Sequence, residues 1–88
     1  MRIKDGYVLR KIADEYIVVA VGEKVTKFSG MMSLNEISAE VWSFLQEDRT
    51  FDELLVMVLS LYDIDEDKAR NDLVKLIAKL ESIGVIEQ

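Results

Sequence analysis

Histidine and cysteine are both absent from this 88-residue chain. Without cysteine the chain can form no disulfide and has no thiolate to bind a metal or act as a nucleophile. Without histidine it lacks the usual zinc ligand and the usual general base near neutral pH, so carboxylates alone would have to carry any catalysis. We therefore expect a protein that is not an enzyme and that holds no metal and no cofactor.

Proline is absent as well, and no apolar run approaches the ~18 residues that a membrane-spanning helix requires. The first six residues carry no apolar core of signal-peptide length. We expect no membrane association and a cytoplasmic location. Hydrophobic residues at 50% and charged residues at 32% are typical of a compact globular protein, and the length allows one core, so residues 1–88 are expected to form a single domain.

Negative charge is unevenly distributed along the chain. The formal net charge is -6, and the acidic excess falls after residue 34, in the half with helical periodicity. Nucleic-acid binding draws much of its affinity from lysine and arginine on phosphates, so an acidic helical half argues against a nucleic-acid partner. A basic peptide segment is a better electrostatic match for that half as a whole.

The first third of the chain has the pattern of β-strands. Residues 7–13 and 16–21 are rich in β-branched and aromatic side chains, and Asp14-Glu15 between them suits a tight hairpin turn. Residues 23–30 mix strand formers with a turn-like ending and predict an extended connector with a bulge near Gly30. Residues 31–34 predict a third strand with Met32 and Leu34 on one face. The expected sheet covers about residues 6–34.

Capping residues divide the remainder into three helices. Asn35 is a good N-cap, Thr50 with Glu53 has the form of a capping box, and Asp65 caps a third helix that Gly84 ends. Apolar residues recur at helical spacing in each segment, and Trp42 is expected in the core. Capping also accounts for the acidic residues around Asp65, which lack the glycine and closing glutamate of a calcium loop. The predicted helices are residues 35–46, 50–62 and 65–83.

A three-stranded antiparallel sheet followed by three short helices predicts an α+β fold like a winged helix-turn-helix. That topology often reads DNA, but the third helix has a mixed surface rather than a basic stripe. A winged-helix protein-interaction or DNA-binding regulatory module therefore stays as the alternative function. A steep loss of duplex binding with salt would identify DNA binding.

A peptide groove is the interpretation that the pattern favours. Val74 is apolar but lies off the core stripe of the third helix, and an exposed strand edge beside such a helix can accept an extended peptide as one more strand. An unpaired edge can also pair with a second copy of the chain, so a homodimer through the sheet edge is a further possibility.

The order of elements, with Gly30-Met31-Met32-Ser33-Leu34-Asn35-Glu36 running into residues 37–42, resembles the PqqD-like family, the small domains also called RiPP recognition elements. Further matches are the start of the second helix at residues 50–54, its stop at residues 62–64, and the third helix closing in Gly84-Val85-Ile86. The resemblance spans nearly the whole chain.

The resemblance implies a non-catalytic peptide chaperone. Such a domain holds the leader of a ribosomally made precursor peptide and presents it to a modifying enzyme, often a radical S-adenosylmethionine enzyme. The leader adds as a fourth strand to the third strand and packs against the third helix. Carried over to this chain, the peptide-binding positions are Lys27, Phe28, Gly30, Met31, Met32, Ser33, Leu34, Arg70, Leu73, Val74 and Ile77.

Within that set, we expect apolar pockets from Met32, Val74 and Ile77, and Arg70 as the residue that recognises charge. The connector at residues 23–29 is longer than the direct hairpin expected in the quinone-cofactor members of the family. The limits of the docking strand between Lys24 and Leu34, and the identity of the precursor peptide, therefore stay open.

Overall fold

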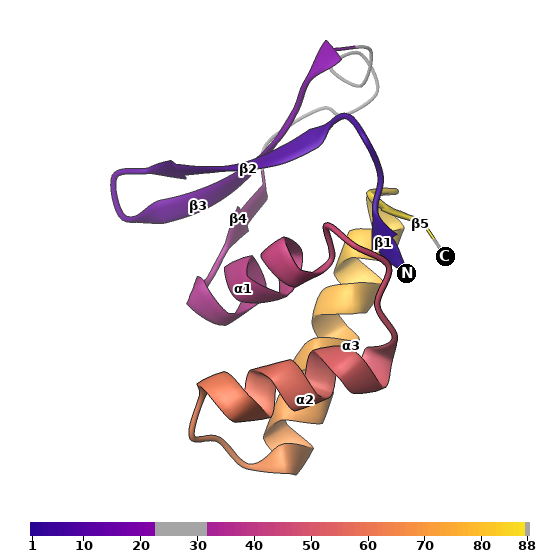
Figure 1. The fold of residues 1–88 in the computed structure, drawn as a ribbon. Helices are drawn as coiled ribbons and strands as arrows, with labels where there is room; N and C mark the ends of the chain where they lie inside the picture. The colour runs from indigo at the N-terminus through magenta and orange to yellow at the C-terminus, as the bar shows by residue number, and fades with distance from the viewer. Residues whose placement is uncertain (23–31, 88) are drawn as a thin grey trace.

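The computed structural model describes residues 1–22 and 32–87. The described elements, in chain order, are β1 (Arg2–Ile3), β2 (Tyr7–Ile12), β3 (Glu15–Ala20), β4 (Met32–Leu34), α1 (Glu36–Phe44), α2 (Phe51–Leu61), α3 (Glu66–Ser82) and β5 (Ile86–Glu87). Figure 1 shows the larger sheet on one side of the three helices, with α1 next to β4. The expected α+β fold, an antiparallel three-stranded sheet followed by three helices, is confirmed.

The larger sheet has the strand order β2-β3-β4, and both pairings are antiparallel. Ile12 pairs with Glu15 across a loop of two residues, one of which, Ala13, has a φ of 56°. A positive φ at the first position of a two-residue loop matches the twist of a hairpin, although glycine would adopt it with less strain. The hairpin was predicted, but its turn is centred one residue earlier than expected.

Strand β4 continues into α1 through a single residue, Asn35. Met32 and Leu34 are buried and Ser33 between them is exposed, which confirms the predicted alternation. Asn35 then caps α1, because its side-chain oxygen accepts the backbone N–H of Ser38 at 2.8 Å. The first-turn geometry of α1 is thereby fixed relative to β4.

The other helix ends follow the capping chemistry read from the sequence. Thr50 and Glu53 form a reciprocal capping box at 3.1 and 2.9 Å, and Asp65 accepts two backbone N–H groups at the start of α3. Gly84, with φ 79°, lets the chain turn back after α3, and the N–H of Val85 bonds to the carbonyl of Leu80. The boundaries differ from the predicted helices by one or two residues.

A second small sheet joins the two ends of the described chain and was not predicted. Arg2 and Ile3 of β1 pair with Glu87 and Ile86 of β5. The N–H of Ile3 also bonds to the carbonyl of Leu45 at the end of α1, at 2.9 Å. Two-residue strands have no periodicity to detect, so this pairing exists only because the core brings the two segments together (Figure 1).

The core is a single apolar cluster to which the sheet, all three helices and the terminal strands contribute. Val18, Val41, Leu45, Leu54, Leu80 and Val85 are its fully buried side chains. Trp42 is buried as predicted. None of the helices in the described ranges has the length and apolar character needed to cross a membrane.

Candidate functional site

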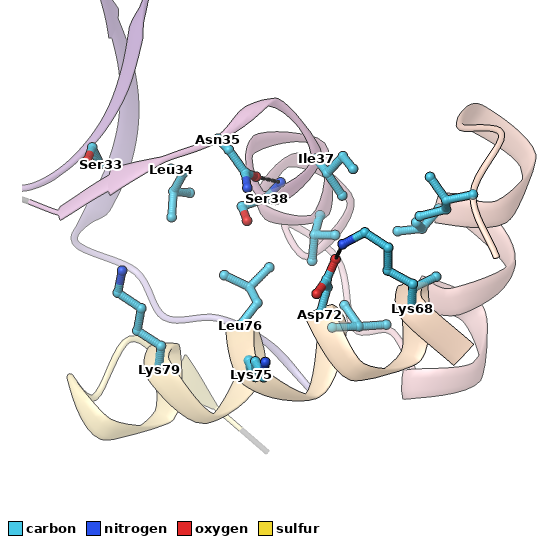
Figure 2. Close-up of a pocket in the computed structure, with 15 residues that line it drawn as sticks. Ser33, Leu34, Asn35, Ile37, Ser38, Lys68, Asp72, Lys75, Leu76 and Lys79 are labelled. Atoms are coloured by element: carbon cyan, nitrogen blue, oxygen red, sulfur yellow. Dashed lines mark hydrogen bonds and ion pairs between the residues drawn. The ribbon is translucent and has the colours of Figure 1, made fainter. Parts of the chain in front are cut away.

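An open cleft of about 460 Å³ runs between β4 with the first turns of α1 on one side and α3 on the other. Figure 2 shows side chains from both sides converging on it. Its volume is within the range of ordinary ligand sites. The lining residues are Ser33, Leu34, Asn35, Ile37, Ser38, Val41, Val58, Ile64, Lys68, Ala69, Asp72, Leu73, Lys75, Leu76 and Lys79.

The inner wall of the cleft is apolar. Leu34, Val41 and Leu73 are buried core residues that show one side to the cleft, while Ile37 and Leu76 are only partly buried. Partly buried apolar side chains on opposite walls, from α1 and α3, still have surface that a partner could remove from water. The cleft therefore offers a hydrophobic contact in its middle.

The α3 rim of the cleft is basic, although the protein as a whole is acidic. Lys68 and Asp72 form an ion pair at 2.8 Å and neutralise each other. Lys75 and Lys79 have no ion-pair partner within 4.0 Å in the described ranges. Figure 2 shows Lys79 extending its ammonium group from α3 toward β4. Two lysine charges are thus available on this rim.

The helical repeat places this rim on one flank of α3. Asp72, Lys75, Leu76 and Lys79 are spaced three, four and seven residues apart, which brings them to the same side of a helix. Leu76 lies between the lysines and the core. The apolar wall and the basic rim are therefore adjacent strips of one helix surface.

On the side of the cleft opposite α3, strand β4 supplies the edge of a β-sheet. Within residues 1–22 and 32–87, β4 is the last strand of its sheet and pairs only with β3. Ser33 and Leu34 of β4 line the cleft. Backbone groups at such an edge can pair with an extended chain, and the edge borders the cleft rather than facing away from it.

The predicted strand positions fall partly within the described structure. Ser33 and Leu34 line the cleft, and Met32 is buried beneath the sheet without lining it. The predicted positions Lys27, Phe28, Gly30 and Met31 lie outside the described residues.

The predicted positions on α3 differ in whether they line the cleft. Leu73 lines the cleft, but Arg70, Val74 and Ile77 do not. Ile77 is buried in the core, Val74 is exposed on the opposite flank of α3, and Arg70 is held by Glu66 at 3.1 Å. A helical wheel identifies both flanks of a core stripe, but only tertiary packing decides which flank adjoins the strand. Of the predicted positions, Arg70 and Val74 lie on the flank of α3 away from the cleft.

Most of the lining residues were not among the predicted positions, including the partly buried Ile37 and Leu76 and the unpaired Lys75 and Lys79. Leu76 is partly buried, whereas its neighbour Ile77 is buried in the core. The available signal was the i, i+4 spacing of the two lysines around Leu76, on the flank opposite Val74.

Asp72, which is paired with Lys68, is the one acidic side chain among the described residues that line the cleft. Burial of its phenol, followed by the carboxylates of Glu36 and Glu40, raises the pKa of Tyr62. None of these three residues lines the cleft. In the part of the chain that the structure describes, no group of three or more acidic side chains is arranged to hold a metal ion. Apart from Asp72, the described acidic side chains therefore lie outside the cleft.

Comparisons with known proteins show which family and which solved structure this chain resembles. The family model described as "Coenzyme PQQ synthesis protein D (PqqD)" matches residues 9–86. A solved structure described as "TbiB1 in Complex with the TbiA(beta) Leader Peptide" has the same fold, with a TM-score of 0.78 and 22% sequence identity over 99% of this chain and 95% of that one. A search of curated proteins gave no match. The match over residues 9–86 shows that this chain belongs to the PqqD family.

Proposed function

We propose that this protein binds the leader segment of a ribosomally made precursor peptide in the cleft between β4 and α3. The observation that carries the proposal is the cleft itself, where an apolar wall, a helix flank and an edge of β4 that is unpaired within residues 1–22 and 32–87 meet. Two comparisons support it: membership of the PqqD family, and a shared fold with a protein whose structure contains a leader peptide.

The mode of binding is strand addition. An extended peptide pairs its backbone with the outer edge of β4, and alternate side chains point toward α3. Ile37 and Leu76 receive an apolar side chain of the peptide between them. Affinity comes from the backbone pairing, whereas selectivity comes from the side chains that enter the cleft.

Chemistry on the peptide is assigned to a partner enzyme. The chain has neither histidine nor cysteine, so it binds and presents the precursor while a modifying enzyme, of the radical S-adenosylmethionine class, carries out the reaction. Family membership supports this division of labour. A ribosomally made precursor is available in the cytoplasm, which is the location that this role requires.

A second copy of the chain is a competing occupant of the same edge. We propose that any homodimer forms through β4 and is displaced by peptide, since the edge can pair with only one strand at a time. Sedimentation velocity with and without bound peptide measures this competition.

The location of the site is tested by two aspartate substitutions on opposite flanks. A peptide is first selected by the wild-type protein from a random twelve-residue library displayed on phage, and its dissociation constant is measured by fluorescence anisotropy. Ile37→Asp places a charge in the apolar wall and should weaken binding by at least about tenfold. Val74→Asp, on the far flank of α3, should leave the dissociation constant within about twofold.

Circular dichroism of both variants separates lost binding from lost folding. Because Ile37 also packs against the core, Ser38→Trp is a second variant that fills the cleft from α1 without removing core packing. Loss of binding in Val74→Asp with retention in the two cleft variants would move the site to the other flank. Failure of the wild-type protein to enrich any peptide would overturn the proposed function.

A further inference from the structure

The two free lysines on the rim of the cleft are not needed for strand addition, which uses backbone groups. Lys75 and Lys79 are exposed and lie on the flank of α3 that faces β4, and Lys79 reaches toward Ser33 and Leu34 (Figure 2). At the other end of the same flank, Asp72 already neutralises Lys68. The positive charge of the cleft is therefore concentrated at one end.

This concentration contrasts with the rest of the molecule, whose formal net charge is -6. A protein with a net negative charge repels acidic peptides over most of its surface. A local pair of lysines therefore determines the position at which an acidic side chain can bind. Ammonium groups form charge-assisted hydrogen bonds with carboxylates, and beside an apolar wall these bonds are less weakened by water than on an open surface.

From these observations we infer that the bound peptide carries an acidic side chain, Asp or Glu, which Lys75 and Lys79 recognise together. This inference rests on the proposed function and adds the chemical class of peptide that the cleft selects. The acidic helical half suggested a basic peptide, but Asp72 in the cleft is paired with Lys68, and the unpaired charges that line the cleft in the described residues belong to Lys75 and Lys79.

Strand geometry also constrains the spacing of the recognised side chains. Leu76, which contacts the apolar side chain of the peptide, lies one position after Lys75 and three positions before Lys79, so all three lie within about 6 Å along α3 at 1.5 Å per residue. An extended peptide advances about 3.3 Å per residue, and its side chains alternate between two faces. The acidic residue is therefore expected about two positions from the apolar residue that enters the cleft, because that is the nearest position on the same face.

The test repeats the phage selection with charge-reversed protein. The double variant Lys75→Glu, Lys79→Glu is compared with wild type and with Lys4→Glu, Arg10→Glu, which changes the net charge equally outside the cleft. Displayed peptides are fused at their C-terminus, so their acidic groups come from side chains and not from a free end. Wild type and the control should enrich an acidic residue about two positions from an apolar one, whereas the cleft variant should lose the acidic residue and keep the apolar one.

A synthetic peptide from the wild-type selection then measures the energetic coupling between its acidic residue and the lysine pair. Replacing its acidic residue with the matching amide should weaken binding to wild type about tenfold, and should not weaken binding to the cleft variant. Selected peptides that lack acidic residues, or an equal loss from amide replacement in both proteins, would overturn the inference while leaving peptide binding intact. Enrichment of no peptide by wild type would overturn the inference together with the proposed function.

Discussion

Asp48 connects the start of the chain to the turn between α1 and α2. Its carboxylate lies 2.7 Å from the α-amino group of Met1, which also donates to the carbonyl of Arg49 at 2.9 Å. Arg49 in turn packs over the ring of Phe44 at 4.0 Å and donates to that residue's carbonyl. These contacts hold β1 against the end of α1, so single polar residues control where the terminal strand lies.

At the residue scale, Asp48→Asn should make stability less dependent on acid pH. The hydrogen bond and then the charge of the Met1 amino group lower the pKa of Asp48 in the folded state. A lowered folded pKa stabilises the protein above the ordinary aspartate value, and this contribution is lost as pH falls through the folded pKa. Wild type should therefore exceed the variant in stability at pH 6, and the difference should disappear toward pH 2.

Urea unfolding followed by fluorescence of the buried Trp42 measures this at both pH values. Asp63→Asn removes an exposed carboxylate that has no ion pair among the described residues and is the matched control. A stability difference between wild type and Asp48→Asn that stays the same from pH 6 to pH 2 would contradict the assignment.

At the scale of the element, each helix begins at a side chain that satisfies its free backbone N–H groups. Asn35, Thr50 and Asp65 do this for α1, α2 and α3. These interactions are local in sequence, which is why the starts of the helices were predicted to within a residue or two. The strands of the hairpin followed for a similar reason, since alternation and a two-residue turn are local patterns.

Thr50→Ala should lower the free energy of unfolding by about 1 kcal/mol, because it leaves the N–H of Glu53 without its acceptor. Thr50→Ser keeps the hydroxyl and should retain most of the stability. Thermal and urea unfolding of the three proteins provide the comparison. Equal losses in both variants would show that the methyl group, and not the capping hydroxyl, stabilises this end of α2.

At the scale of the whole molecule, β1 and β5 close the fold by bringing its two ends together. Ile3 and Ile86 pair directly and are both buried in the common core. The N–H of Lys4 also bonds to the carbonyl of Val85 at 2.8 Å. Loss of the pairing between β1 and β5 would expose the ends of α1 and α3 together. The pairing therefore stabilises both helices.

Ile3→Ala should therefore destabilise the protein by about 2–5 kcal/mol, the range for truncating a buried isoleucine. Ile12→Ala makes the same truncation at an exposed position near the hairpin turn and should cost well under that amount. Differential scanning calorimetry measures both. A loss for Ile3→Ala no larger than that for Ile12→Ala would show that β1 contributes little to folding.

The sequence by itself determined the three helices, the hairpin and the class of fold, because caps, turns and apolar periods act over a few residues, whereas the pairing of β1 with β5 had no local signal. It also indicated the edge at Ser33 and Leu34 as a docking position, which stays a prediction, and the structure adds that both residues line a cleft. Tertiary structure alone decided which flank of α3 meets β4. Lys75, Leu76 and Lys79 line the cleft and Arg70 and Val74 do not, because of how α3 docks against α1 and β4, and that docking is set by the packing of side chains far apart in the sequence.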